Sequence, residues 1–554
     1  MGCAITKNID KNNILEADGS VVKEIYNYKF KNWTHSEDIT IFEPKSKLGI
    51  CNIIKWANAT NFRVRVLEHF NELLYTSINQ CIFISMINSI DSQNISDLQE
   101  IKIVNISEDK TKAYIRIGSA ITNEQLRKWS IDMLENNGNS WTMPLNSVVE
   151  TTFGETNANI CHGVGLKYKN LSNLVRCIEF VNVKGELQII DNPLHLTAAA
   201  GCFGLLGIIT ELVLELDVMT YSKWKPEIMP MTLAIPPSEN YIFAPNIKKY
   251  FDFDFDFDNE ELIKEFDYKC KNTYSEWFWV PFSKNSWVNT LNSDGLIEDP
   301  NFTLDYPSLS EMFLQKELKY IYEEPNILAS LSKVNQDTLE HFEAMHSLHV
   351  SEIVMPVSNL INFGHIQNIR VRNMEFSIPI PNLENGEADF NICREIWWGT
   401  ISIIYKWRKY NKCPVKLSVE MRIIDKSDIL LSTEYGNNFG TCCIEVVTTT
   451  NIDEYEWLIF RQDLVNLWAL IALNYKKNNE PLAIIPHFTK DWQDLTIIYN
   501  NNTLQMIDYL KIIYKDNIIK FKFILNEISQ DGGYTFSNLD KFSTLHLNKL
   551  ICDK

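Results

Sequence analysis

Glycine is scarce in this chain, and two short glycine clusters constrain its fold more than any other feature. The chain has 20 glycines among 554 residues. One cluster lies within residues 152–165 and the other within residues 201–207. Glycine lets backbone N–H groups approach a phosphate or a flat ring closely. Neither cluster matches G-x-G-x-x-G after a strand or G-x-x-x-x-G-K-[ST], which argues against a Rossmann or P-loop nucleotide site.

The composition is that of a globular protein with more than one core. A length of 554 residues predicts two or three domains, and 45% hydrophobic residues supply the cores. The formal net charge of −19 disfavours nucleic acid and anionic lipid as partners. The 12 cysteines are scattered without a C-x-x-C pair, so we expect reduced, buried thiols and predict no metal site.

The N-terminal residues bear on where the protein resides. Residues 1–7 lack the apolar core of a secretory signal, and the chain contains no apolar run of membrane-spanning length. The opening Met-Gly-Cys-Ala-Ile-Thr fits N-myristoylation of Gly2, with Cys3 placed for a second acyl chain. We therefore expect a cytoplasmic protein, or one held at a membrane surface through acylated Gly2 and Cys3.

Hydrophobic periodicity predicts an α+β chain. Thr122 and Gln125 form a capping box before an amphipathic helix, and Gly138 ends that helix. The predicted elements are a helix over 44–61, a strand over 62–66, a helix over 122–137, a hairpin over 175–190, a helix over 193–200 and a strand over 208–216.

The amino-acid composition changes after residue 220, where proline, aromatic and acidic residues become frequent. We predict a first domain over 1–220, a second over 221–470, and a C-terminal segment, 471–554, that returns to the first. Residues 251–258 alternate phenylalanine and aspartate, which predicts a strand with one aromatic face, at a domain edge.

Residues 414–424 alternate strictly between apolar and polar side chains, so Glu420 and Arg422 project from one face of a predicted strand. A carboxylate there can take the proton of a substrate hydroxyl. A guanidinium beside it can hold a developing alkoxide or the negative charge of a reduced cofactor. From spacing alone, an exposed ion pair worth little is the alternative.

Several motifs follow one another in the order of a known family. They are Ile117-Gly118-Ser-Ala, Pro144-Leu-Asn146, Phe153-Gly154 with Asn159-Ile-Cys-His162-Gly163, Ile178-Glu-Phe-Val181, Gly185-Glu186, and Ala198 to Thr210. The series resembles the FAD-binding domain of the vanillyl-alcohol oxidase superfamily and covers roughly residues 40–217. The resemblance implies FAD wrapped between two α+β subdomains, with an α+β substrate domain that contains a large antiparallel sheet. Its implied cofactor-binding residues are His69, Gly118, Pro144, Gly154, Asn159, His162, Gly163, Gly165, Gly204, Gly207 and Ile208.

The second part of the chain narrows the resemblance to the type II, covalent-flavin cholesterol oxidases. Residues 276–282 resemble their E-x-x-W-F-P-F segment, and residues 418–422 resemble their E-x-R strand. Residues 486–492 resemble the P-H-W-x-K-x-W stretch of the superfamily, with Phe488 in place of tryptophan, and Met374-Glu375-Phe376 fits a less specific strand.

The resemblance implies an oxidase that moves a hydride from an alcohol to FAD and reduces O2 to H2O2. It assigns catalysis to Glu420, Arg422, Glu276 and Lys490, with Glu276 as a second carboxylate or gate and Lys490 near the N1–C2=O end of the flavin. The alcohol is sterol-like or sugar-like. An aldonolactone oxidase is the second choice, because that class lacks the segment 277–282.

Two departures from the family favour a different hypothesis. The first phosphate loop, residues 63–72, contains no glycine and carries Glu68 and Glu72, whose charges would repel phosphates. It holds His69 at the position where the family attaches flavin covalently, and Glu155 replaces a glycine of the second loop. The alternative is a catalytically degenerate fold reused as a structural or assembly protein, in a virion for example. A homo-oligomer is left open.

Overall fold

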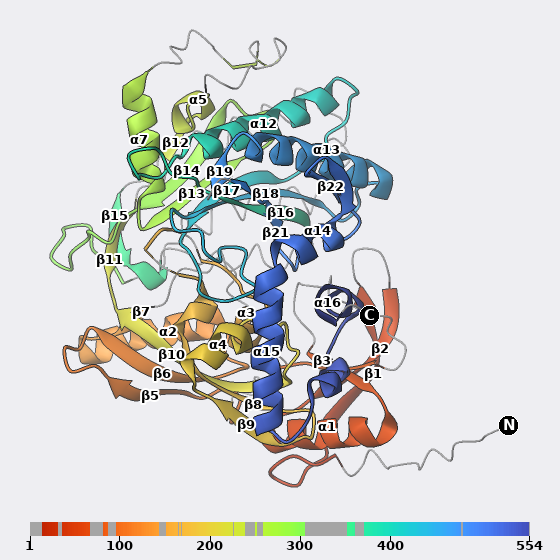
Figure 1. Ribbon diagram of the computed structural model, residues 1–554. Coiled ribbons are helices and arrows are strands. Elements are labelled where there is room, and N and C mark those ends of the chain that lie inside the picture. Colours follow the sequence, from red (N-terminus) through yellow and green to blue (C-terminus); the bar gives the residue numbers. More distant parts are fainter. Residues whose placement is uncertain are drawn as a thin grey trace.

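The structure is a computed structural model. It describes residues 14–31, 36–66, 81–86, 96–142, 151–163, 165–167, 169–224, 227–238, 247, 250–251, 259–304, 352–359, 371–477 and 480–552. Three large sheets organise these residues, with the seven-stranded sheet stacked above the six-stranded one in the view of Figure 1.

The four-stranded sheet is formed by the N-terminal residues. Its strand order is β1 (Lys23–Lys31), β2 (Ser36–Glu43), β4 (Cys81–Ile84) and β3 (Arg63–Val66). Helix α1 (Lys47–Thr60) begins at Ser46, whose hydroxyl accepts the N–H of Gly49, and it buries Ile50, Ile53 and Ile54. The predicted helix and the predicted strand after it are both present.

The six-stranded sheet follows. It consists of β5 (Ile101–Ile106), β6 (Lys112–Gly118), β10 (Ile208–Val218), β8 (Val175–Val181) and β9 (Leu187–Ile190) in that order, with β7 (Trp141–Thr142) paired to β10. Helix α2 (Asn123–Asn137) has the predicted capping box of Thr122 and Gln125 and ends at left-handed Gly138. The hairpin β8–β9 and helix α4 (Pro193–Ala199) also confirm their predictions.

The seven-stranded sheet is antiparallel throughout. Its order is β12 (Glu227–Pro230), β14 (Asn285–Leu291), β13 (Tyr274–Trp279), β17 (Ser418–Ile424), β18 (Thr441–Thr449), β16 (Val371–Pro379) and β21 (Ile485–Pro486). Helices α12 (Asn391–Arg408) and α13 (Glu454–Ala472) cover one face (Figure 1), where the Phe376 and Trp468 rings lie 5.6 Å apart. Because side chains alternate along a strand, the residues next to Phe376 point to the opposite face.

Shorter elements complete the described chain. They are α3 (Phe153–Ala158), β11 (Tyr221–Trp224), α5 (Met231–Ala234), α7 (Glu260–Cys270), β15 (Ile353–Pro356), β19 (Lys476–Lys477), β20 (Glu480–Pro481), β22 (Thr496–Tyr499), β23 (Asn502–Gln505), α14 (Met506–Ile513), α15 (Lys515–Asp531) and α16 (Leu545–Leu547). None of the described helices is both long enough and apolar enough to cross a membrane.

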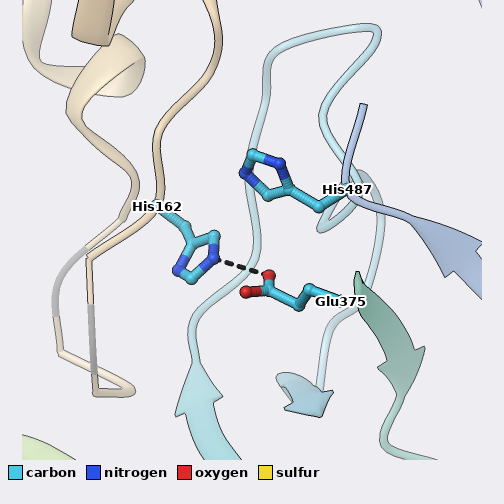
Figure 2. Close-up of side chains that lie close together, drawn as sticks. All are labelled: His162, Glu375 and His487. Carbon is cyan, nitrogen blue, oxygen red and sulfur yellow. Dashed lines mark hydrogen bonds and ion pairs between the residues drawn. The ribbon is translucent and has the colours of Figure 1, made fainter. Parts of the chain in front are cut away.

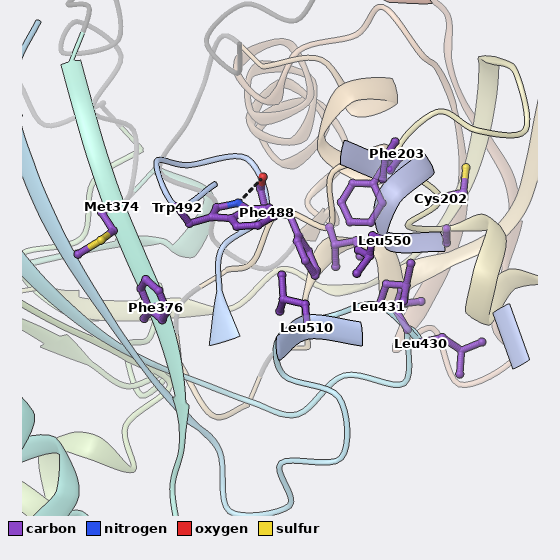
Figure 3. Packing of buried hydrophobic residues seen from close by; sticks show 14 of the residues in the cluster. Cys202, Phe203, Met374, Phe376, Leu430, Leu431, Phe488, Trp492, Leu510 and Leu550 are labelled. Atoms are coloured by element: carbon purple, nitrogen blue, oxygen red, sulfur yellow. Dashed lines mark hydrogen bonds between the residues drawn. The ribbon is translucent and has the colours of Figure 1, made fainter. Parts of the chain in front are cut away.

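A continuous apolar core joins the sheets (Figure 3). Phe488, the residue that departs from the family motif, packs edge-on against Phe203 at 5.4 Å, and its carbonyl accepts the indole N–H of Trp492 at 3.0 Å. Helix α15 lies against α4, and the amide of Gln188 on β9 donates to the Ile528 carbonyl of α15 at 2.8 Å. The predicted strand 251–258 lies outside the described residues except for Phe251, and the predicted domain boundaries stay predictions.

Candidate active site

The register of the seven-stranded sheet gathers carboxylates on the face opposite the helices. Glu276 of β13 lies across from Arg422 of β17, and Glu420 of β17 lies across from Glu445 of β18. Glu445 in turn faces Glu375 of β16. Four neighbouring strands thus contribute one acidic residue each. The prediction that Glu420 and Arg422 share a face is correct, although β17 begins only at Ser418.

Arg422 is the centre of this cluster. Its Nε donates to Glu276 Oε1 at 2.6 Å, its Nη1 donates to Glu445 Oε2 at 2.9 Å, and its Nη2 donates to Glu420. The hydroxyl of Tyr274 donates to the second oxygen of Glu276. Burial by itself would lower the pKa of Arg422, but the carboxylates, Glu276 first, raise it well above its usual value. Each guanidinium nitrogen binds a carboxylate, and because Nη1 and Nη2 each carry a second N–H, the contact to an alkoxide expected from the sequence can form beside these ion pairs.

Lys490 joins the cluster from the loop that follows β21. Its ammonium lies 2.5 Å from Glu375 Oε2 and 2.7 Å from Glu445 Oε1. The loop is held beside β16 because the His487 N–H donates to the Glu375 carbonyl at 3.0 Å. Burial opposes the charge of Lys490, but Glu375 and Glu445 raise its pKa above the usual value. The structure therefore brings the four predicted catalytic residues into one network.

His162 reaches the same network from the loop after α3 (Figure 2). Its Nδ1 lies 3.0 Å from the Gly163 carbonyl and its Nε2 lies 2.8 Å from Glu375 Oε1. Burial would lower the pKa of His162, but Glu375 raises it above the usual value, while Lys490 and His162 hold the pKa of Glu375 well below its usual value despite burial. Both ring nitrogens lie against oxygen atoms, and the His162 side chain is 10% exposed.

Glu420 is the member of the cluster that titrates near neutral pH. Burial, helped by the neighbouring Glu445 and Glu276 and opposed by Arg422, raises its pKa to about 7. The Ser418 hydroxyl donates to Glu420 Oε1 at 2.7 Å and fixes the carboxylate. A carboxylate with this pKa is well matched to accept a proton at neutral pH.

Below the charged face, α3 and its surroundings hold neutral polar groups of a different kind. Among the described residues, none bonds to either amide atom of Asn157 or Asn159, and none bonds to the hydroxyls of Ser119 and Thr156, although all four side chains are buried. Buried polar atoms without partners cost free energy, and a polar ligand satisfies them. The FAD implied by the motifs fits this observation.

Three of the glycines predicted to bind the cofactor also pack closely against the backbone of other segments. A Cβ on Gly165 (φ 106°) would lie 1.6 Å from the Thr273 carbonyl oxygen. The same Cβ on Gly118 or Gly207 would come within 2.2 Å of a backbone oxygen. The N–H of Gly165 also donates to the Ile423 carbonyl at 2.7 Å, which joins the loop after α3 to β17.

The other predicted cofactor residues are spread around these loops. Gly154 lies against Ser119, Gly204 (φ 73°) lies against Arg65, and Ile208 is the buried first residue of β10. Gly163 contacts His162 through its carbonyl, as described above. His69 and Pro144 lie outside the described residues, as do Gly2 and Cys3.

The start of the first phosphate loop is occupied by protein contacts. Nη1 of Arg65 on β3 donates to the carbonyls of Phe203 and Phe542, at 2.9 and 2.7 Å. The loop after β3 lies outside the described residues.

Sequence reasoning missed Glu445 and did not assign roles to Glu375 or His487, both of which lay in quoted motifs. A signal was present for Glu445, because it is the only charged residue of a strand, β18, in which every residue is buried. Glu375 is likewise flanked by fully buried Met374 and Phe376. A lone carboxylate in a buried strand requires a charged partner.

Comparisons with known proteins agree with this architecture at the level of fold. No family model matches the chain, and no curated protein matches it in sequence. Among solved structures, cholesterol oxidase from B. sterolicum matches with a TM-score of 0.67 and 12% identity over 96% of this chain and 97% of that chain. A solvent-stable cholesterol oxidase matches with a TM-score of 0.66 and 15% identity over 98% and 99%. The 6-hydroxy-D-nicotine oxidase of Arthrobacter nicotinovorans matches with a TM-score of 0.53 and 12% identity over 93% and 96%. The chain has the fold of these oxidases, as the motif order led us to expect.

Proposed function

We propose that the chain is an FAD-dependent oxidase that takes a hydride from an alcohol, sterol-like or sugar-like, and reduces O2 to H2O2. One observation carries the proposal: the carboxylate of Glu420, which is 14% exposed and has a pKa of about 7, lies beside Arg422 on the face that the residues after α3 approach. Solved structures of oxidases that share the fold support the same reaction class.

The cofactor, when bound, supplies the hydride acceptor. Asn157, Asn159, Thr156 and Ser119 would hold it, because their buried polar atoms have no partner among the described residues. The motif order predicts the same role for Asn159, and its unpartnered buried amide supports it. Gly118, Gly165 and Gly207 would act indirectly, because they determine the backbone conformation around these side chains.

Side chains of this protein accept the proton, orient the base and stabilise charge. Oxidation of an alcohol removes a hydride from carbon and a proton from oxygen, and ionised Glu420 accepts that proton. Ser418 keeps the carboxylate oriented through its 2.7 Å hydrogen bond. His162 and Lys490 place positive charge beside Glu375, where negative charge from the reaction is stabilised.

The cluster also excludes water. Glu276 and Glu375 are fully buried, and the contact between His162 and Glu375 joins the loop after α3 to the seven-stranded sheet. Removing water strengthens each electrostatic interaction in the site.

A substrate screen tests the proposal. Protein reconstituted with FAD is incubated with sterols, sugar alcohols and aldonolactones, and H2O2 is measured with a coupled peroxidase. We expect H2O2 from one class of secondary or primary alcohol, together with anaerobic bleaching of the flavin by the same alcohol. A protein that holds FAD but is neither bleached nor turned over by any of these alcohols contradicts the proposal.

A further inference from the structure

We propose that His162, Glu375 and His487 form a binding site for a divalent first-row transition metal, for which zinc is the best-suited ion. One ligand atom of each residue lies within 4.8 Å of the others. The three residues come from the loop after α3, from β16 and from the loop after β21, as Figure 2 shows. A metal here would therefore tie three distant segments of the chain together. This site goes beyond the proposed oxidase activity.

The donor set is one that zinc prefers. Two imidazole nitrogens and one carboxylate oxygen, with a fourth position left for water, form a common zinc site with metal–ligand distances of about 2.0–2.2 Å. Tetrahedral ligands at those distances are about 3.3 Å apart. His162 Nε2 and Glu375 Oε1 are 2.8 Å apart, so a small outward movement of one side chain admits the ion in place of their hydrogen bond.

Each ligand is already oriented by a second partner. His162 Nδ1 lies 3.0 Å from the Gly163 carbonyl, which leaves Nε2 pointing at Glu375. His487 Nδ1 lies 3.0 Å from the Thr489 hydroxyl and accepts the Thr489 N–H at 3.4 Å, so ligation of a metal through Nε2 requires the tautomer in which Nδ1 donates to that hydroxyl. Glu375 uses Oε2 for Lys490 at 2.5 Å, and its Oε1 faces His162. Oxygen partners of this kind fix ligating imidazoles in known metal sites.

The charge of the surroundings favours a divalent cation. Glu276, Glu375, Glu420 and Glu445 carry four negative charges, whereas Arg422 and Lys490 carry two positive ones. Metal binding displaces the proton of His162, and with both imidazoles neutral and Glu420 ionised the cluster has an excess of two negative charges. One divalent ion balances that excess, and the attraction is strong because Glu375, Glu276 and Glu445 are buried.

Metal titration of the full-length, chelator-treated chain tests the site. We expect one equivalent of Zn2+ to bind in calorimetry and one zinc per chain after dialysis. His162→Gln and His487→Gln should each weaken that binding by more than 100-fold, whereas Thr489→Val should weaken it by about 10- to 100-fold. His195→Gln is the control, because His195 lies elsewhere, against Glu527. A second control replaces His341, His346 and His349 with glutamine, since these closely spaced histidines outside the described residues offer zinc another site.

Zinc X-ray absorption of the wild-type protein guards against variants that fail to fold. The proposal predicts two imidazole ligands and a carboxylate oxygen, and it predicts that the control variants keep the site. It is overturned if the wild-type chain binds no zinc, if binding is unchanged in both His162→Gln and His487→Gln, or if it disappears only in the triple variant. These measurements of zinc binding do not depend on flavin content or turnover. Failure of the metal site can therefore be distinguished from failure of the proposed oxidase activity.

Discussion

The polar face of the seven-stranded sheet and the surroundings of α3 lie next to each other, yet they satisfy their polar groups in opposite ways. On the sheet, Arg422 and Lys490 are each bound by carboxylates of the same chain. Around α3, Asn157 and Asn159 have no partner for their amides among the described residues. The charged face is complete by itself, as chemistry requires of preorganised groups, whereas the α3 region requires a ligand to complete it.

Glu420→Gln should have the largest effect of the substitutions that test this comparison. It keeps the shape of the side chain and removes the base. We expect kcat of the alcohol oxidation to fall by about 10²- to 10⁴-fold while FAD stays bound. Glu215→Gln is a matched control, because Glu215 of β10 binds Lys112 and Arg176 of the six-stranded sheet and should leave kcat unchanged. Equal turnover of Glu420→Gln and wild type would remove Glu420 from the mechanism.

Removal of the central cation tests whether the charged face is complete by itself. Arg422→Met leaves the carboxylates of Glu276, Glu420 and Glu445 without their guanidinium partner, so we expect the free energy of unfolding to fall by about 3–5 kcal/mol, measured by urea denaturation. Arg176→Met removes a half-exposed pair and should cost about 0–1 kcal/mol. If Arg422→Met costs no more than Arg176→Met, the pairing on the sheet is not what stabilises it.

The pH dependence of turnover tests whether Glu420, on the charged face of the sheet, accepts the proton of the substrate. Burial raises the pKa of Glu420 to about 7, and only the ionised form accepts a proton. Below that pKa, kcat should fall about tenfold per pH unit as Glu420 becomes protonated, and above it kcat should level off. Steady-state kinetics from pH 5 to 9 provide the measurement, and a rate that is flat between pH 5 and 7 would contradict the assignment.

Asn157→Leu tests the α3 region, and it should have opposite effects on stability and on binding. Without FAD, removal of an unpartnered buried amide should leave the melting temperature equal or higher. With FAD, the loss of hydrogen bonds should raise the dissociation constant by about 3- to 10-fold. A variant that loses stability without FAD and binds FAD normally would show that Asn157 is structural.

Thr122→Ala should have the smallest effect on stability. It tests whether the effects of the other substitutions are local to the site. Loss of the capping box of α2 should lower the free energy of unfolding by about 1 kcal/mol in thermal denaturation. FAD affinity and the pH profile should stay as in the wild type. A shift of either would mean that the substitutions above also act through global stability.

The sequence predicted local features of the fold and a part of the site. The helix at Thr122, the hairpin after Val175 and the shared face of Glu420 and Arg422 depend on neighbours in the chain, and the structure confirms them. The partners of Arg422 depend on strand register, because Glu445 faces Glu420 only once β17 and β18 are paired. No spacing along the chain reports that pairing.

The glycines also show that local sequence does not report which segments come together in the fold. We expect Gly118, Gly165 and Gly207 to approach a cofactor, and backbone oxygens of other segments also lie where their side chains would be. A glycine pattern shows that something comes close to the backbone. Whether that is a cofactor or another strand depends on tertiary packing.

The visible spectrum of the purified protein, before and after acid precipitation, tests the central claim most directly. The account predicts a flavin spectrum in the native protein or after addition of FAD. Absorbance that stays in the precipitate would further indicate covalent attachment, with His69 as the expected site, and absorbance released to the supernatant would indicate FAD held without it. A colourless protein that FAD cannot reconstitute would contradict the oxidase and favour the alternative, a fold reused for assembly.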